Sequence, residues 1–197
     1  RYLNIFTRAI SGGIFNITAQ DVSPDWTAYN PETLIEEGDL RITAVGVYHG
    51  PVPGLAFRID YRGRSIVYSG DTSTRGENMT ALSQGADLLI YDTAITDTLP
   101  NGPNDQVFFQ LHTTPTRLGE VAAAAGARRL LLSHLTPITE PRLDEVRRVI
   151  RSQGYRGRMK AAEDLQVINL DRGHQRHHGR LDRGHRRHHD RPERDDD

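Results

Sequence analysis

Three strongly apolar runs of this sequence each lead to a side chain that can bind a metal ion. His49 follows the run at residues 42–48, Asp71 follows the run at 65–68, and His134 follows the run at 130–133. Imidazole and carboxylate are both common ligands of divalent metals. A ligand at the tip of a buried strand sits on a rigid base and points out of the sheet. The pattern therefore predicts one metal site at one edge of a sheet.

Residues 41–170 alternate between strand-like and helix-like patterns, which favours an α/β fold with a sheet covered by helices. Strands are predicted at 14–18, 41–48, 55–61, 65–70, 88–91, 129–133 and 166–170, and helices at 77–85, 115–126 and 141–153. Arg62-Gly63 predicts a hairpin between two of the strands. Thr114 and Gly126 are the expected N-cap and stop of the second helix.

The last 27 residues have a different character from the rest of the chain. A segment beginning Asp-Arg-Gly-His at residue 171 recurs at residue 182 with almost no apolar side chain. Such a repeat cannot bury a core, so we expect one domain over residues 1–170 and a disordered tail over 171–197. Because six of the nine histidines lie in this tail, weak metal chelation by the tail is an additional hypothesis.

Composition narrows the classes of function. The 197-residue chain has no cysteine, which excludes disulfides and thiolate metal sites. A formal net charge of -1 argues against general nucleic-acid affinity. No apolar run approaches the ~20 residues of a membrane span, and no signal peptide is visible. We expect no membrane partner and slightly favour the cytoplasm.

Five motifs, taken in order, resemble one known family. They are the glycine-led strand at 54–60, Ser-Gly-Asp-Thr at 69–72, Gly-Ala-Asp-Leu-Leu-Ile at 85–90, His-Thr-Thr-Pro at 112–115 and Leu-Leu-Leu-Ser-His at 130–134. In order and spacing they resemble the C-terminal half of a metallo-β-lactamase-fold hydrolase, in the branch of RNase Z, arylsulfatases and related phosphodiesterases. The resemblance implies an incomplete αββα sandwich.

The resemblance also implies a site and a chemistry. In the family, two metal ions, usually zinc, share a bridging aspartate and activate a water. By resemblance Asp71 is the bridging and catalytic ligand, His49 and His134 each bind one metal, and His112 contacts the scissile group as a catalytic residue. The expected substrate is a small ester or phosphodiester. Nucleic acid stays open as a substrate, and a homodimer stays open as an assembly.

The sequence departs from the family pattern in two places. The His-x-His-x-Asp-His signature, which supplies further metal ligands, is absent. We therefore expect the chain to lack the first half of its fold and to be poorly active alone. Where RNase Z proteins have His-Glu-Ala-Thr, this chain has Tyr91-Asp92-Thr93-Ala94. The proton-relay His-Glu pair is missing, and Asp92 could only partly replace it.

Other interpretations remain at this stage. Asp71 or Thr72 could cap a helix, and His112 could be a cap or an exposed loop residue. The chain could be an inactive half-domain whose histidine-rich tail binds metal. A doubly wound domain of receiver type also uses a strand-end aspartate, although it does not explain His49, His112 and His134.

Overall fold

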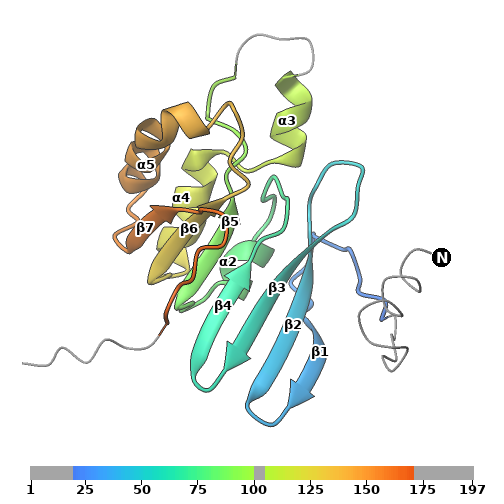
Figure 1. The fold of residues 1–197 in the computed structure, drawn as a ribbon. Coiled ribbons are helices and arrows are strands. Elements are labelled where there is room, and N and C mark those ends of the chain that lie inside the picture. The colour runs from blue at the N-terminus through green and yellow to red at the C-terminus, as the bar shows by residue number, and fades with distance from the viewer. Residues whose placement is uncertain (1–19, 100–104, 171–197) are drawn as a thin grey trace, which may run out of the picture.

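The computed structural model describes residues 20–99 and 105–170, and in them one sheet of seven strands in sequential order, β1 to β7. The strands are β1 (Glu32–Glu37), β2 (Leu40–Val47), β3 (Gly54–Tyr61), β4 (Arg64–Tyr68), β5 (Leu88–Asp92), β6 (Arg129–Ser133) and β7 (Arg158–Ala161). Neighbours from β1 to β4 pair antiparallel, whereas those from β4 to β7 pair parallel (Figure 1). Three of the carboxyl ends, those of β4, β5 and β6, therefore share one edge.

Helices cover one face of this sheet (Figure 1). They are α2 (Asn78–Leu82), α4 (Pro115–Ala124) and α5 (Leu143–Ser152), the last preceded by a 3-10 turn, η1 (Glu140–Arg142). A further helix, α3 (Asp105–Leu111), precedes α4. The mixed α/β architecture predicted from the sequence is confirmed.

The core lies between the helices and alternate residues of the strands. Because successive strand residues point to opposite faces, one set of side chains meets the helices. From the sheet this set is Val45, Val47, Ala56, Val67, Leu89, Tyr91, Leu130 and Leu132, and from the helices it includes Met79, Leu82, Leu118, Val121, Val146 and Ile150. All are nearly inaccessible to solvent, so the strand register is fixed by this one apolar layer.

The opposite face of the sheet is also apolar but only partly covered. Its members include Ile42, Phe57, Ile59, Ile66 and Ile90, which are half-buried. The segment after β7 crosses in front of this face (Figure 1), and Pro24 lies against Gly46. A sheet with helices on one face and apolar residues on the other is what one half of an αββα sandwich presents.

The predicted N-cap of α4 and the predicted hairpin turn are both confirmed. Thr114 caps α4 by accepting a hydrogen bond from the Arg117 backbone N–H at 3.3 Å. Arg62 and Gly63 both have positive φ, 48° and 70°, which is the geometry of a tight two-residue hairpin turn between β3 and β4.

Three elements differ from the sequence prediction. Strand β1 and helix α3 were not predicted, and the last strand is β7 at Arg158–Ala161, whereas residues 166–170 form no strand. β1 and β7 are rich in charged side chains, which conceals them in an apolarity pattern, and pairing with β2 and β6 fixes them. The strand predicted at 14–18 and the tail at 171–197 lie outside the described residues, so the domain boundary at 170 remains a prediction.

Candidate active site

Four of the chemically important side chains lie at the ends of strands. His49 follows β2, Asp71 follows β4, Asp92 is the last residue of β5, and His134 comes directly after β6. His112 lies on the short connection between α3 and α4. The parallel pairing of β4, β5 and β6 brings their carboxyl ends together, which is how residues far apart in the sequence come to share one site.

The loop that carries Asp71 is held by hydrogen bonds to the residue before His49. Thr72 Oγ1 donates to the Tyr48 carbonyl at 3.0 Å, and the Ser73 backbone N–H donates to the same carbonyl at 2.9 Å. Gly70 makes this turn possible: its φ is +60°, and a Cβ there would lie 2.6 Å from the Leu55 carbonyl oxygen. The loop after β4 is thereby tied to the residue that precedes His49.

Asp71 and His134 form the solvent-facing pair of the site. His134 Nε2 lies 3.6 Å from Asp71 Oδ2, and both side chains are nearly half exposed. His134 has a positive φ of 54°, a strained conformation for a residue with a side chain. Two ligand atoms of a tetrahedral zinc, each about 2.0–2.2 Å from the ion, lie roughly 3.3–3.5 Å apart. The observed separation is close to that value, so these donors fit a shared divalent ion.

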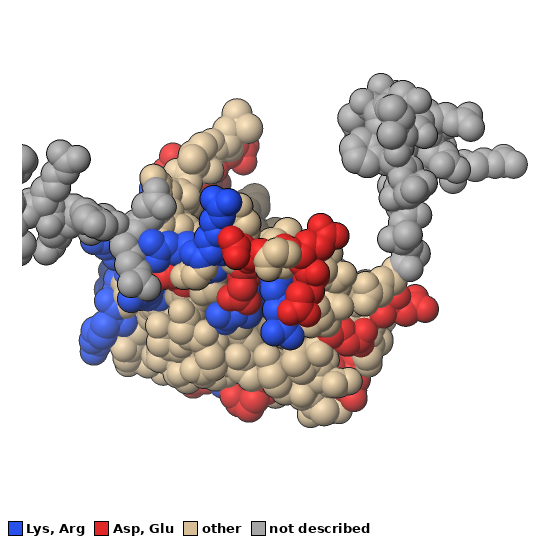
Figure 2. Space-filling view, turned by 90° about the horizontal axis from the view of Figure 1, so that it is seen from below, with Lys and Arg blue, Asp and Glu red and all other residues tan. Residues whose placement is uncertain are grey.

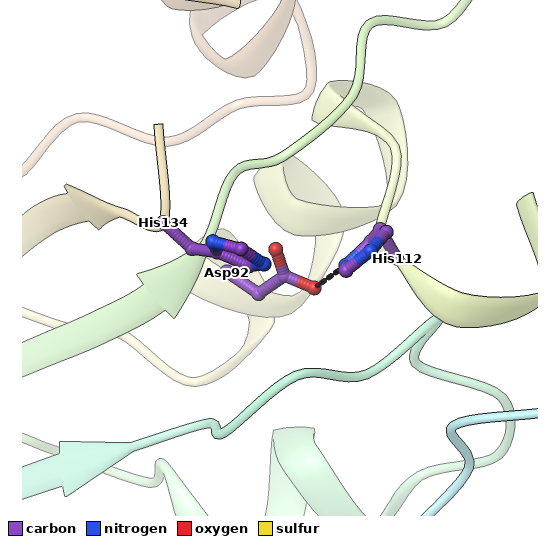
Figure 3. A group of neighbouring side chains, drawn as sticks. All are labelled: Asp92, His112 and His134. Atoms are coloured by element: carbon purple, nitrogen blue, oxygen red, sulfur yellow. Dashed lines mark hydrogen bonds and ion pairs between the residues drawn. The ribbon is translucent and has the colours of Figure 1, made fainter. Parts of the chain in front are cut away.

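Asp92 and His112 form a second, buried pair. His112 Nδ1 donates to Asp92 Oδ2 at 2.9 Å, as Figure 3 shows. Asp92 is 2% exposed, and its carboxylate also accepts the backbone N–H groups of Thr72 and Ala94. These bonds fix the orientation of the carboxylate and hence of the imidazole.

The electrostatics of this pair favour the protonated imidazole. Burial alone would lower the pKa of His112. The hydrogen bond to Asp92, together with the negative charges of Asp92 and Asp71, outweighs burial, so the pKa of His112 is raised above its ordinary value.

Ring contacts join the two pairs. The His112 ring centroid lies 5.1 Å from that of His134 and 5.8 Å from that of His49. The side chains of Asp92, His112 and His134 point toward one another (Figure 3), with ligand atoms within 4.8 Å. The structure therefore brings together all the residues singled out in the sequence: His49, Asp71, His112 and His134.

Asp92 is the residue that sequence reasoning undervalued. The sequence predicts that Asp92 could only partly replace the glutamate of the relay, and in the structure its carboxylate does contact His112. The available signal was that Asp92 ends an apolar strand, as Asp71 follows one. The alternative capping roles fail for the described helices: α2 begins at Asn78 with Glu77 as its N-cap, and Thr114, not His112, caps α4.

An open cavity of about 750 Å³ lies beside His134. Its lining includes Ser133, His134 and the three carboxylates of Glu140, Glu163 and Asp164. A substrate that approaches His134 from this side meets negative charge.

Among the described residues no helix is both long and apolar enough to cross a membrane.

Comparison with known proteins places the fold. A family model described as "Beta-lactamase superfamily domain" matches residues 12–135. The ribonuclease Z of Mycobacterium avium (strain 104) is 28% identical over 126 residues, which is 62% of this chain and 45% of that protein. An uncharacterized protein of Mycobacterium tuberculosis (strain ATCC 25618 / H37Rv) is 37% identical over 115 residues, 58% of this chain and 38% of that protein.

Two solved structures agree with this assignment. The metallo-beta-lactamase fold protein YhfI from Bacillus subtilis superposes with a TM-score of 0.54 at 26% identity, covering 68% of this chain and 50% of that chain. The short form of human tRNase Z gives a TM-score of 0.53 at 25% identity, covering 73% and 48%. The chain thus spans about half or less of the length of these relatives.

Proposed function

We propose that this chain, which belongs to the beta-lactamase superfamily, carries part of the active site of a metal-dependent hydrolase. The bonds that it would hydrolyse are phosphodiester, sulfate-ester or other ester bonds. The observation that carries the proposal is that two pairs of side chains lie beside each other at one edge of the sheet. A half-exposed pair, Asp71 and His134, lies beside a buried pair, Asp92 and His112. The first suits a metal, and the second suits proton transfer.

His49, Asp71 and His134 are the proposed metal ligands. Two imidazoles and a carboxylate are a donor set that zinc favours. When bound, a divalent metal supplies a water of lowered pKa and positive charge at the reacting group. A set of Asp92, His112 and His134 is less suitable, because His112 Nδ1 donates directly to Asp92 at 2.9 Å and leaves no room for an ion between them.

His112 is the proposed general acid. Its Nδ1 proton is committed to Asp92, so Nε2 is the ring atom that can release a proton to the leaving oxygen. The raised pKa of His112 keeps that second proton available. Asp92 positions the ring and, with Asp71, stabilises its positive charge.

The charge around the site bears on the substrate. Figure 2 views the molecule from below, from the end of the sheet away from the site, and shows Lys and Arg gathered on one side with Asp and Glu beside them. The cavity beside His134 carries three carboxylates, Glu140, Glu163 and Asp164. Glu163 is paired with Lys160 at 3.2 Å, so the lining disfavours a long polyanion on this side more than a substrate with a single negative charge.

Four single variants separate the proposed roles. We expect Asp71→Ala to cause the largest loss of bound Zn²⁺, and His49→Ala and His134→Ala each to weaken Zn²⁺ binding. His112→Ala should leave metal content unchanged and lower turnover about 10²-fold or more. Metal content by atomic emission and hydrolysis of phosphodiester and sulfate-ester model substrates are measured together.

Turnover is best measured with a segment bearing His-x-His-x-Asp-His supplied, because a catalytic zinc needs about three protein ligands. The chain alone should be weakly active or inactive. Full activity of the chain alone with stoichiometric metal would contradict this ligand assignment. Unchanged Zn²⁺ binding in Asp71→Ala would contradict the metal site itself.

A further inference from the structure

A cluster of buried hydroxyl groups lies directly behind the site. It consists of Thr72, Thr74, Tyr91 and Thr113, each 4% exposed or less. Thr74 Oγ1 lies 2.5 Å from the Tyr91 hydroxyl and 2.6 Å from Thr113 Oγ1. Thr113 Oγ1 lies 2.5 Å from the Thr72 carbonyl oxygen. We call this set the hydroxyl cluster.

The direction of every hydrogen bond in the hydroxyl cluster follows from counting protons. A hydroxyl has one proton to donate, and a carbonyl oxygen can only accept. Thr113 must therefore donate to the Thr72 carbonyl and accept from Thr74. Thr74, having used its proton, must accept from Tyr91. The result is one directed chain from Tyr91 through Thr74 and Thr113 to the Thr72 carbonyl.

Three of the four members of this chain adjoin a residue of the proposed site in the sequence. Thr72 follows Asp71, Tyr91 precedes Asp92, and Thr113 follows His112. Thr72 also donates through its backbone N–H to Asp92 and through its hydroxyl to the carbonyl of Tyr48, which precedes His49. The hydroxyl cluster thus joins the four segments that carry His49, Asp71, Asp92 and His112.

Tyr91 reaches the hydroxyl cluster from the core, not from the loops that carry the proposed metal ligands. It faces the helices in the core, where it pairs with Leu132, whereas Asp92 turns to the site. Tyr91 therefore cannot replace a ligand. A phenylalanine would fill nearly the same space, so packing alone does not account for the hydroxyl.

We propose that the hydroxyl cluster is a positioning device that sets the separation between the proposed metal ligand Asp71 and the Asp92–His112 pair. The inference rests on the proposed function for its metal readout but not for its second readout. Buried, fully satisfied hydrogen-bond chains rigidify the groups they join. Partners behind metal ligands typically change metal affinity 10- to 100-fold when removed.

The test uses the full chain and three variants of the hydroxyl cluster. Thr113→Val keeps the shape of the side chain but removes the hydroxyl that bonds to Thr74 and to the Thr72 carbonyl. Thr113→Ser keeps that hydroxyl. Tyr91→Phe removes the hydroxyl that donates to Thr74. Tyr155→Phe is the matched control, because Tyr155 is equally buried and donates to the Arg158 carbonyl at 3.0 Å, away from the site. Zn²⁺ affinity of the tight site is measured by competition calorimetry. The His112 Nδ1–H resonance in metal-free protein is followed by ¹⁵N NMR.

We expect Thr113→Val to weaken tight Zn²⁺ binding about 10- to 100-fold and to broaden or abolish the Nδ1–H resonance. Tyr91→Phe should have a smaller effect in the same direction, since two of the three bonds remain. Thr113→Ser should retain wild-type affinity within about threefold. Tyr155→Phe should lower the denaturation midpoint but leave both site readouts unchanged.

Two results would overturn the inference. In one, Thr113→Val and Tyr91→Phe lose stability as Tyr155→Phe does, but their Zn²⁺ affinity and their His112 Nδ1–H resonance remain as in wild type. The other is the absence of tight Zn²⁺ binding in the wild-type chain, together with a His112 Nδ1–H resonance in Thr113→Val that is the same as in wild type. In that second result the proposed metal site fails too. A resonance lost in Thr113→Val without any tight Zn²⁺ site would support the positioning role while the proposed function fails.

Discussion

The Nδ1 atom of His112 lies 2.9 Å from Oδ2 of Asp92, so the last residue of β5 holds an imidazole from the connection between α3 and α4. Asp92 is nearly inaccessible and His112 only slightly less buried, and a buried charge-assisted bond of this kind orients the ring.

Asp92→Asn should disturb the ring orientation of His112 without unfolding the protein. The amide cannot both accept from His112 and keep the bonds from the Thr72 and Ala94 N–H groups with the strength of a carboxylate. Where turnover is measurable it should fall about 10²-fold or more. In the metal-free chain the His112 Nδ1–H resonance should weaken. Asp60→Asn is the control, because it alters an ion pair with Arg58 within β3, away from the site. It should change neither turnover nor the resonance.

Gly70→Ala should displace Asp71 and destabilise the fold. Gly70 has a positive φ, and an added Cβ would lie 2.6 Å from the Leu55 carbonyl oxygen, so strain and a backbone clash act together. Gly85→Ala is the control, because Gly85 also has a positive φ (+64°) but no atom within 4 Å of the added Cβ. We expect Gly70→Ala to lose about 1–3 kcal/mol more than Gly85→Ala in chemical denaturation. Equal losses in the two variants would show that the close approach to Leu55 is unimportant.

Deletion of residues 171–197 should leave tight metal binding intact. The proposed ligands His49, Asp71 and His134 lie in the described fold, whereas the six histidines of residues 171–197 lie outside it. A metal that binds only the folded state stabilises it by about 2.7 kcal/mol at 100 times its dissociation constant. The Zn²⁺-induced rise in melting temperature should therefore survive the deletion and vanish in Asp71→Ala. Loss of tight Zn²⁺ binding on deletion would instead favour the tail as the chelating segment.

Asp87→Asn should lower stability at neutral pH but not in acid. Burial alone would raise the pKa of Asp87, but hydrogen bonds from Arg128 and the Ser65 backbone N–H, with the positive charges nearby, outweigh burial and lower it. A lowered folded-state pKa contributes stability above the unfolded value of about 3.9, and that stability is lost as the pH falls through the folded value.

We expect Asp87→Asn to lose roughly 1–3 kcal/mol at pH 7, measured by urea denaturation, with the difference from wild type shrinking below about pH 4. Asp144→Asn removes a carboxylate from an exposed pair with Arg147 and should stay within about 0.5 kcal/mol at every pH. A pH-independent difference for Asp87→Asn would mean that its charge has no part in the effect.

The sequence was most informative where a local signal agrees with the tertiary environment. The strand predicted at 129–133 matches β6, and Thr114-Pro115 marks the start of α4. These segments combine continuous apolarity or cap chemistry with burial, so local preference and packing favour the same structure. Charged β1 and β7 lack that agreement, because their pairing partners are distant in the sequence and decide the outcome.

Local patterns were enough to predict the α/β class, the family and the candidate residues His49, Asp71, His112 and His134. They could do so because strand ends and motif order are local properties. The contact of Asp92 with His112, and the place of Tyr91 in the core and not in the site, depend on strand pairing that no local pattern reveals. Both depend on the register of β5 between β4 and β6, and a shift of one residue would exchange the faces on which Tyr91 and Asp92 lie.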